Sequence, residues 1–145
     1  MCISNSKAEK SCGTVPFTVE DGKILYLLIQ SKENGNCGFP KGHMEGSETE
    51  EETALRETFE EASLRPQIIK DQRFEAEYTL KNGNNKTVVY FLADFTDQIP
   101  RHNEGFEDLK YLILPFHKAY DMLTFENTKD ILKKANRYIE RNVIV

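Results

Sequence analysis

The pattern of hydrophobic and polar positions predicts strands over the first third of the chain. Segments 12–20 and 23–31 each have the length and apolar content of a strand. Between them lies Asp21-Gly22, a dipeptide typical of two-residue hairpin turns. Residues 24–29 are almost continuously apolar, as in a strand that is buried on both faces. This region is therefore predicted to form a β-hairpin whose second strand lies inside a sheet.

A second hairpin is predicted in the middle of the chain. Segments 73–80 and 86–95 have the composition of strands, and the turn-rich sequence KNGNN at 81–85 separates them. An acidic, glycine-containing loop over 97–108 then leads to a short predicted strand at 109–114. These elements add three strands to the predicted sheet.

Two helices are predicted, one in the acidic middle region and one near the end of the chain. The segment 38–43, GFPKGH, breaks regular structure before the first helix. Ser47 is a suitable N-cap, Glu50 completes a capping box three residues later, and Pro66 marks a stop beyond the end. Residues 127–141 carry apolar side chains at helical spacing. Because strands and helices are mixed, helices are expected on both faces of one mixed sheet.

Length and composition indicate one soluble α/β domain over residues 1–145. A chain of this length can bury a single ordinary core, and 39% hydrophobic with 30% charged residues is typical of globular proteins. Cys2, Cys12 and Cys37 match no metal-ligand or redox spacing, which favours free thiols in a reducing compartment. The sequence shows neither a signal-peptide pattern nor an apolar stretch of membrane-spanning length. We expect a cytoplasmic protein without a membrane partner, either a monomer or a weak homodimer.

The negative charge of the chain is concentrated in one segment. Residues 48–61 contain seven glutamates and one arginine, a charge of −6, whereas the whole chain carries −5. A helix that places Glu57, Glu60 and Glu61 within one turn brings like charges together, which is destabilising. A hard divalent cation bound by carboxylate oxygens is the simplest compensation. The remainder of the chain is nearly neutral, so no broad basic face for duplex nucleic acid is predicted.

The segment Gly42–Leu64 resembles the Nudix box, the signature of hydrolases that split nucleoside diphosphates linked to another group. Gly42 and all the charged positions of the pattern match at the right spacing over 23 residues. Two positions depart, because Thr58 stands where the family usually has an aliphatic residue and Ser63 where it has glycine. The Ser63 departure bears on the helix exit, which the glycine normally helps to turn. The resemblance implies a Nudix-type α/β/α sandwich.

The resemblance also implies a metal site on the helix. Glu57, Glu60 and Glu61 correspond to the metal ligands of the family, with the main-chain carbonyl of Lys41 as a further ligand. Their spacing agrees, since side chains at i and i+4 share one helix face. Mg²⁺ is the expected ion, with Mn²⁺ as an alternative. The competing interpretation is a solvated helix face held by salt bridges, the usual meaning of a charge run.

Other acids are assigned supporting roles or none. By resemblance, Glu48 is a helper acid paired with Arg56. Glu104, or alternatively Glu107, could supply another metal ligand or the general base, and a solvated acidic loop is the equal alternative. The carboxylate that deprotonates water stays open among Glu61, Glu60 and these two loop residues. Other glutamates of the helix are expected to be surface and capping residues, namely Glu50, Glu51 and Glu52.

Further motifs resemble the Nudix branch that hydrolyses diadenosine tetraphosphate asymmetrically. They are GFPKGHME at 38–45, KTVVYFLA at 86–93 and LTFEN at 123–127. Two residues depart from that branch, Cys37 and Tyr111, since tryptophan is common at both positions. The resemblance implies hydrolysis of dinucleoside polyphosphates, with diadenosine tetraphosphate giving ATP and AMP. RNA 5′-triphosphate ends are an alternative substrate, and a nucleotide-binding sensor without turnover is an alternative outside enzymes.

Five residues are candidates for substrate binding. Lys41, His43 and Lys86 could bind the polyphosphate, because a long anionic chain needs cations beyond the metal. Ordinary surface solvation is the alternative for each. Tyr78 and Tyr90 could stack on adenine through their flat faces, and core packing is their alternative.

Overall fold

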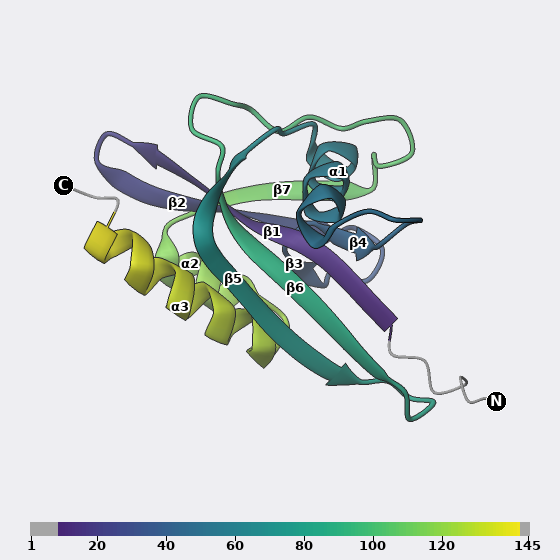
Figure 1. Ribbon diagram of the computed structural model, residues 1–145. Helices are drawn as coiled ribbons and strands as arrows, with labels where there is room; N and C mark the ends of the chain where they lie inside the picture. The colour runs from purple at the N-terminus through teal and green to yellow at the C-terminus, as the bar shows by residue number, and fades with distance from the viewer. Residues whose placement is uncertain (1–8, 143–145) are drawn as a thin grey trace.

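A mixed sheet between two helical layers makes up the structure, a computed structural model that describes residues 9–142 (Figure 1). Seven strands form the sheet, in the order β3-β2-β1-β6-β5, with β4 paired to β1 and β7 paired to β2. The central β1–β6 pair is parallel and every other pair is antiparallel. The elements are β1 Glu9–Glu20, β2 Lys23–Ser31, β3 Cys37–Gly38, β4 Lys41–His43, α1 Glu50–Ala62, β5 Gln67–Thr79, β6 Asn85–Asp94, β7 Leu109–Leu114, α2 Phe116–Met122 and α3 Glu126–Asn142.

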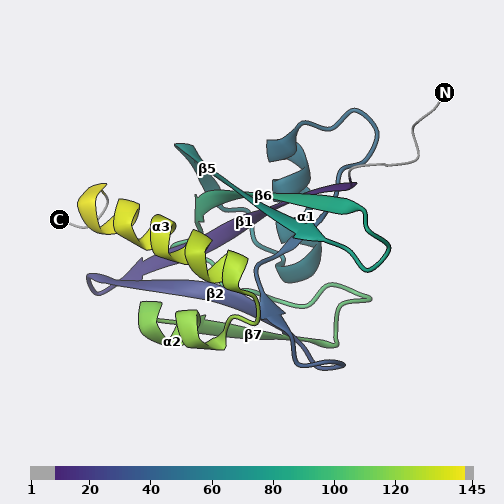
Figure 2. The same ribbon diagram turned by 90° about the horizontal axis from the view of Figure 1, so that it is seen from below.

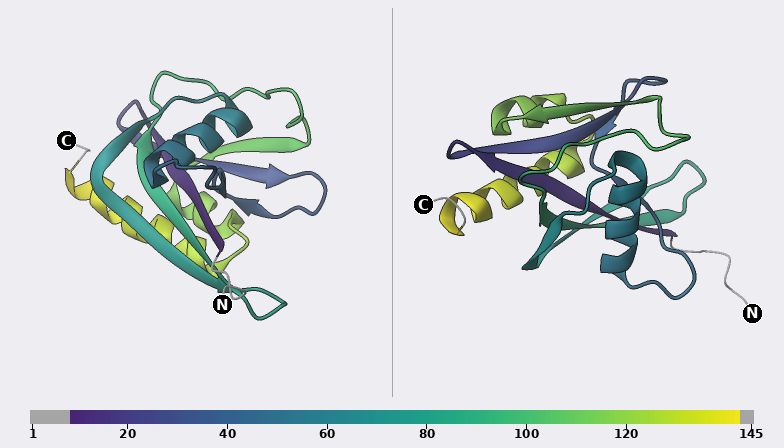
Figure 3. Two further views of the ribbon diagram at one scale, coloured as in Figure 1. Left: turned by 45° about the vertical axis from the view of Figure 1, so that its right-hand side comes forward. Right: turned by 90° about the horizontal axis from the view of Figure 1, so that it is seen from above.

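Helices cover both faces of this sheet, as predicted. Helix α3 and the short α2 lie on one face (Figure 2), where their apolar side chains share a core with Val15 and Leu92. Helix α1 lies on the opposite face (Figure 3), where Ala54 packs with Cys12 and Val89. Strands β1 and β6 therefore contribute side chains to both cores, since successive side chains of a strand point to opposite faces of the sheet. The predicted α/β/α sandwich around a mixed sheet is confirmed.

Predictions of local structure were confirmed where the sequence carries a clear turn dipeptide or a clear helical period. The β1–β2 hairpin turns at Asp21 and Gly22, whose φ angles of 52° and 77° are those of a type I′ turn. Helix α3 spans Glu126–Asn142, within one residue of the predicted range at each end. Cys12 and Cys37 are buried free thiols, and Cys2 lies outside the described residues. No helix within residues 9–142 is long and apolar enough to cross a membrane.

The start of α1 was predicted wrongly. Its N-cap is Thr49 rather than Ser47, and Thr49 forms the capping box with Glu52. Glu50 is also not a simple surface residue, because both of its carboxylate oxygens accept hydrogen bonds from Arg73 at 2.8 Å. This ion pair, together with Lys10, ties the first turn of α1 to strands β1 and β5.

Several short elements were absent from the prediction. Strands β3 and β4 lie in the segment that was expected to break regular structure, and α2 was not predicted. Strand β5 begins at Gln67, ahead of the predicted residue 73, and an irregularity between Ile68 and Arg73 interrupts its pairing with β6. Asp71 has a positive φ of 66° within this irregularity.

Candidate active site

Gly42 lets strand β4 approach helix α1 closely. It pairs with Cys12 of β1, and its Cα faces the carboxyl group of Glu57. A Cβ at this position would fall well inside van der Waals contact with all three carboxyl atoms of Glu57. The first residue of the predicted motif therefore provides space for one of its acids.

Arg56 is the centre of a hydrogen-bonded network that orients the acids of the helix. Its Nε donates to Glu48 Oε2 at 2.6 Å, and its Nη2 donates to Glu48 Oε1 at 3.1 Å. Its Nη1 donates to Glu57 Oε2 at 2.9 Å and to Glu60 Oε2 at 3.2 Å. Arg56 also lowers the pKa of Glu48 to about 2, with help from the backbone N–H of Glu45. The predicted pairing of Glu48 with Arg56 is present, and it holds Glu48 ionised.

Glu61 lies next to Glu57 and faces Lys41. Burial and, after it, the neighbouring charge of Glu57 together raise the pKa of Glu61 to about 8, against the opposing effect of Lys41. Burial and the charge of Lys86 lower the pKa of Lys41. Two carboxylates that share one half-buried position repel each other, and a hard cation stabilises both. The oxygen donors of this pair therefore fit a divalent metal.

Not all of the predicted ligands come together. No group of three His, Cys, Asp or Glu side chains within residues 9–142 is close enough to hold a metal. Glu57 and Glu61 are neighbours, whereas the Glu60 carboxylate is held by Arg56 and is 42% exposed. The assignment of Glu60 as a ligand stays a prediction, as does that of the Lys41 carbonyl.

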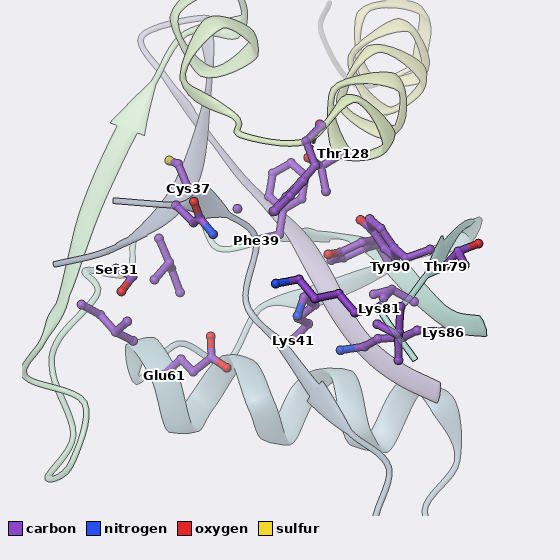
Figure 4. Close-up of a pocket in the computed structure, with 18 residues that line it drawn as sticks. Ser31, Cys37, Phe39, Lys41, Glu61, Thr79, Lys81, Lys86, Tyr90 and Thr128 are labelled. Atoms are coloured by element: carbon purple, nitrogen blue, oxygen red, sulfur yellow. Dashed lines mark hydrogen bonds between the residues drawn. The ribbon is translucent and has the colours of Figure 1, made fainter. Parts of the chain in front are cut away.

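A cavity of about 560 Å³ opens beside Glu61. Figure 4 shows Lys41, Lys81 and Lys86 on one side of it, with Glu61 of α1 nearby. Lys41 and Lys86 were predicted from their motifs, but Lys81 was not. Its only signal in the sequence is its position in the β5–β6 turn, five residues before Lys86. Three lysines around one cavity provide the positive charge that a polyphosphate needs.

Aromatic side chains form another part of the cavity wall. Tyr90 is buried and meets the ring of Phe39 edge to face, with centroids 5.6 Å apart. Tyr78 is half-buried and meets Phe125 in the same way at 6.3 Å. All four rings line the cavity. The predicted tyrosines are thus both packed and adjacent to the cavity, and Phe125 is 48% exposed there.

Three predicted residues lie away from the cavity. The His43 side chain is 64% exposed, lies 3.5 Å from Glu9, and is not part of the cavity lining. Glu104 and Glu107 are exposed in the β6–β7 loop, residues 95–108. Glu107 accepts a hydrogen bond from the N–H of Gly105, and Glu104 makes no side-chain hydrogen bond to the rest of the described chain. The structure does not bring these three side chains into contact with the acids of α1.

Fold and site together define the class of the protein. An α/β/α sandwich places an acidic helix beside a cavity with lysines and aromatic rings, which suits an anionic ligand that carries a flat base. The NUDIX domain model matches residues 10–135. The chain belongs to the NUDIX domain family, and it is a hydrolase of that family.

Known proteins similar to the chain narrow the family further. The pig bis(5′-nucleosyl)-tetraphosphatase [asymmetrical] is 32% identical over 143 residues, covering 91% of this chain and 96% of the pig protein. The crystal structure of a Caenorhabditis elegans Ap4A hydrolase binary complex has a TM-score of 0.84 at 26% identity, covering 92% of this chain and 99% of that one. The Escherichia coli dihydroneopterin triphosphate pyrophosphohydrolase shares the fold, with a TM-score of 0.69 at 16% identity over 88% of this chain and 97% of its own. The predicted resemblance to the asymmetrical tetraphosphatase branch is confirmed.

Proposed function

We propose that the protein is a Mg²⁺-dependent pyrophosphohydrolase of dinucleoside polyphosphates that cleaves diadenosine tetraphosphate to ATP and AMP. The observation that carries this proposal is that one cavity brings Glu61 together with three lysines and four aromatic rings. A polyphosphate with a base at its end needs both kinds of partner. The similarity to the pig enzyme over almost its whole length supports the same substrate class.

The lysines and the exposed aromatic ring of the cavity have distinct chemical parts in this proposal. Lys41, Lys81 and Lys86 bind the bridging phosphates and hold them beside Glu61. The exposed ring of Phe125 and the neighbouring Tyr78 provide a flat surface on which an adenine stacks, and such stacking contributes about 1–3 kcal/mol per base. Binding at both ends fixes which phosphorus atom lies nearest the acids.

The acids of α1 complete the proposed chemistry. Glu57 and Glu61 would hold Mg²⁺, with Glu60 and the Lys41 carbonyl as further ligands, and the ion would supply charge neutralisation and activate water. Arg56 keeps the Glu57 and Glu60 carboxylates oriented through its Nη1. The water oxygen adds to one phosphorus, one bridging P–O bond breaks, and the water proton passes to a carboxylate. Glu104 is our candidate for this proton acceptor.

Hydrolysis in ¹⁸O-labelled water tests the substrate and the bond that breaks. With Mg²⁺ present, diadenosine tetraphosphate should give ATP and AMP, with label in only one of the two products. The Glu61→Gln variant should lose at least about 10²-fold in kcat while staying folded. Glu51→Gln is the matched control, since Glu51 is exposed on the same helix, and it should keep full activity.

Two further measurements distinguish the alternatives, which are RNA 5′-triphosphate ends as the substrate and a nucleotide-binding sensor without turnover. A transcript carrying labelled γ-phosphate is offered beside the dinucleotide, and faster release of pyrophosphate from RNA would replace our substrate. Tight nucleotide binding in calorimetry without product after hours would instead indicate a sensor. Absence of both ATP and AMP from the wild-type reaction refutes the proposed activity.

A further inference from the structure

The carboxyl end of α1 is held by groups from outside the helix. The last four carbonyls of an α-helix have no partner within it, and α1 has no basic residue in its last turn. Here the four carbonyls belong to Phe59, Glu60, Glu61 and Ala62, and among them the Phe59 carbonyl also accepts the N–H of the cap residue Ser63 at 2.8 Å. Whatever satisfies these carbonyls also fixes the backbone that carries Glu60 and Glu61.

The β6–β7 loop and the strand after it supply the donors. The Asn103 amide donates to the carbonyl of Phe59 at 2.7 Å and to that of Glu60 at 2.9 Å. The Arg101 backbone N–H donates to the carbonyl of Ala62 at 2.8 Å. The Tyr111 hydroxyl of β7 donates to the carbonyl of Glu61. All four carbonyls therefore have an external donor, and Asn103 serves two of them.

Ser63 adds a contact that the usual residue of the motif could not make. It ends α1 in the left-handed conformation, with φ 58° and ψ 29°, where glycine is the unstrained choice. Its hydroxyl donates to Asn103 Oδ1 at 2.9 Å. Both amide hydrogens and the oxygen of Asn103 are thus engaged by α1 and its cap. This arrangement leaves the Asn103 side chain one orientation.

From these contacts we propose that Asn103 is a positioning residue that, together with Ser63, fixes the position of Glu104 relative to Glu60 and Glu61. Glu104 follows Asn103 directly in the chain, and its own side chain makes no hydrogen bond or ion pair to any other residue between 9 and 142. Asn103 is therefore the nearest anchor between Glu104 and α1. The inference rests on the proposed function, in which Glu104 accepts the proton.

Two substitutions separate positioning from stability. Asn103→Ala removes three hydrogen bonds and should lower kcat about 10²-fold, the usual effect of misplacing a catalytic group by about 1 Å. KM should change much less, because Asn103 does not line the cavity. Ser63→Gly loses one hydrogen bond but relieves the left-handed backbone, so its thermal midpoint should not fall although its kcat does. Ile99→Ser is the control, since Ile99 is 73% exposed in the same loop, and it should match the wild type.

A double variant shows whether Asn103 acts through Glu104. If it does, Asn103→Ala combined with Glu104→Gln should be no slower than Glu104→Gln alone. Losses that multiply would instead mean that Asn103 acts only on the general structure, and they would overturn the inference. Full kcat in Asn103→Ala would overturn it as well, while the proposed function would stand.

Hydrogen exchange gives a readout that does not depend on activity. Asn103→Ala should speed amide exchange in the loop around Glu104, and the Ile99→Ser control should not. If the wild type fails to hydrolyse diadenosine tetraphosphate, the proposed function falls and exchange alone decides whether Asn103 anchors the loop. Unchanged exchange in Asn103→Ala would refute the anchoring.

Discussion

Replacing Gly42 by alanine should separate the activity of this protein from its stability. The added methyl group would meet the Glu57 carboxyl group, which is the far end of a flexible side chain. Ordinary van der Waals contact begins at 3.4 Å, and the carboxyl group lies too close by about 1 Å. The backbone of Gly42 does not have a positive φ, so alanine itself fits there. The expected response is movement of Glu57 alone.

The size of this movement determines how much stability and how much activity the variant should lose. A retreat of about 1 Å breaks the 2.9 Å hydrogen bond from Arg56 Nη1 to Glu57, which costs about 1 kcal/mol for a pair that is partly exposed. Misplacing a catalytic group by the same distance lowers the rate about 10²-fold. The Gly42→Ala variant should therefore stay folded and lose nearly all of its hydrolysis. Its affinity for Mn²⁺ should fall too, because Glu57 is a proposed ligand.

Gly13→Ala is the matched contrast in the neighbouring strand. Its methyl group would meet the Pro40 carbonyl and the Cα and Cβ of Lys41, the last two at 2.8 Å and 2.7 Å. Backbone of β4 cannot retreat as a carboxylate can, so this variant should lose about 3 kcal/mol of unfolding free energy. Urea unfolding, calorimetric titration with Mn²⁺ and turnover of diadenosine tetraphosphate measure the three quantities. Wild-type turnover in folded Gly42→Ala, or destabilisation equal to that of Gly13→Ala, would refute the reasoning.

Two further predictions concern how α1 is fastened to the sheet. The Thr58 hydroxyl donates to the Ala54 carbonyl and lies 2.8 Å from the Thr14 hydroxyl, which must then be the donor of that pair. Thr58→Val should therefore lower the free energy of unfolding by about 1–3 kcal/mol, because it leaves the Thr14 hydroxyl unpaired. Adding Thr14→Val should recover most of this loss in chemical unfolding, and additive losses would disprove the pairing. Arg73 lowers the pKa of Glu50 to about 2 from an ordinary 4.5, so this pair stabilises the protein above about pH 4.5 and stops doing so as the pH falls towards 2. Unfolding measured from pH 6 to 2 should show a loss of about 1 kcal/mol that Glu50→Gln lacks, and identical profiles would contradict it.

Local signals were sufficient for much of the fold but not for the start of α1. The hairpin at Asp21-Gly22 follows from residues that are adjacent in sequence. For the helix start, Ser47 and Thr49 are equally good caps, because each is followed three residues later by a glutamate. Glu48 decides between them in the structure. It stands just before the helix and accepts hydrogen bonds from the Glu45 N–H, the Thr53 hydroxyl and Arg56. These contacts form only when the chain folds, so the sequence pattern does not show them.

Short strands and long-range contacts could not be predicted from the sequence, for a related reason. Strands β3 and β4 contain two and three residues, too few to show a period, and they exist because Gly38 and Gly42 pair with longer strands. Lys81 enters the cavity only because the β5–β6 turn lies over it, and Asn103 reaches α1 across more than forty residues. Neither residue lies in a motif that identifies its role. By contrast, the shared face of Glu57 and Glu61 follows from helical spacing, and the pairing of Arg56 with Glu48 follows from the resemblance to the Nudix box.

The departures from the Nudix pattern are most informative when the structure supplies their partners. Thr58 stands in place of an aliphatic residue and meets Thr14 of β1. Ser63 stands in place of glycine and meets Asn103, while Tyr111 of β7 donates to the carbonyl of Glu61. Each of these side chains uses a polar group to join α1 to a different element, and each partner is far away in sequence. Because a polar group in such a contact is costly when its partner is missing, the departures and their partners form matched pairs. Restoring the family residue at one position should therefore disturb the placement of α1 more than the residue change alone suggests.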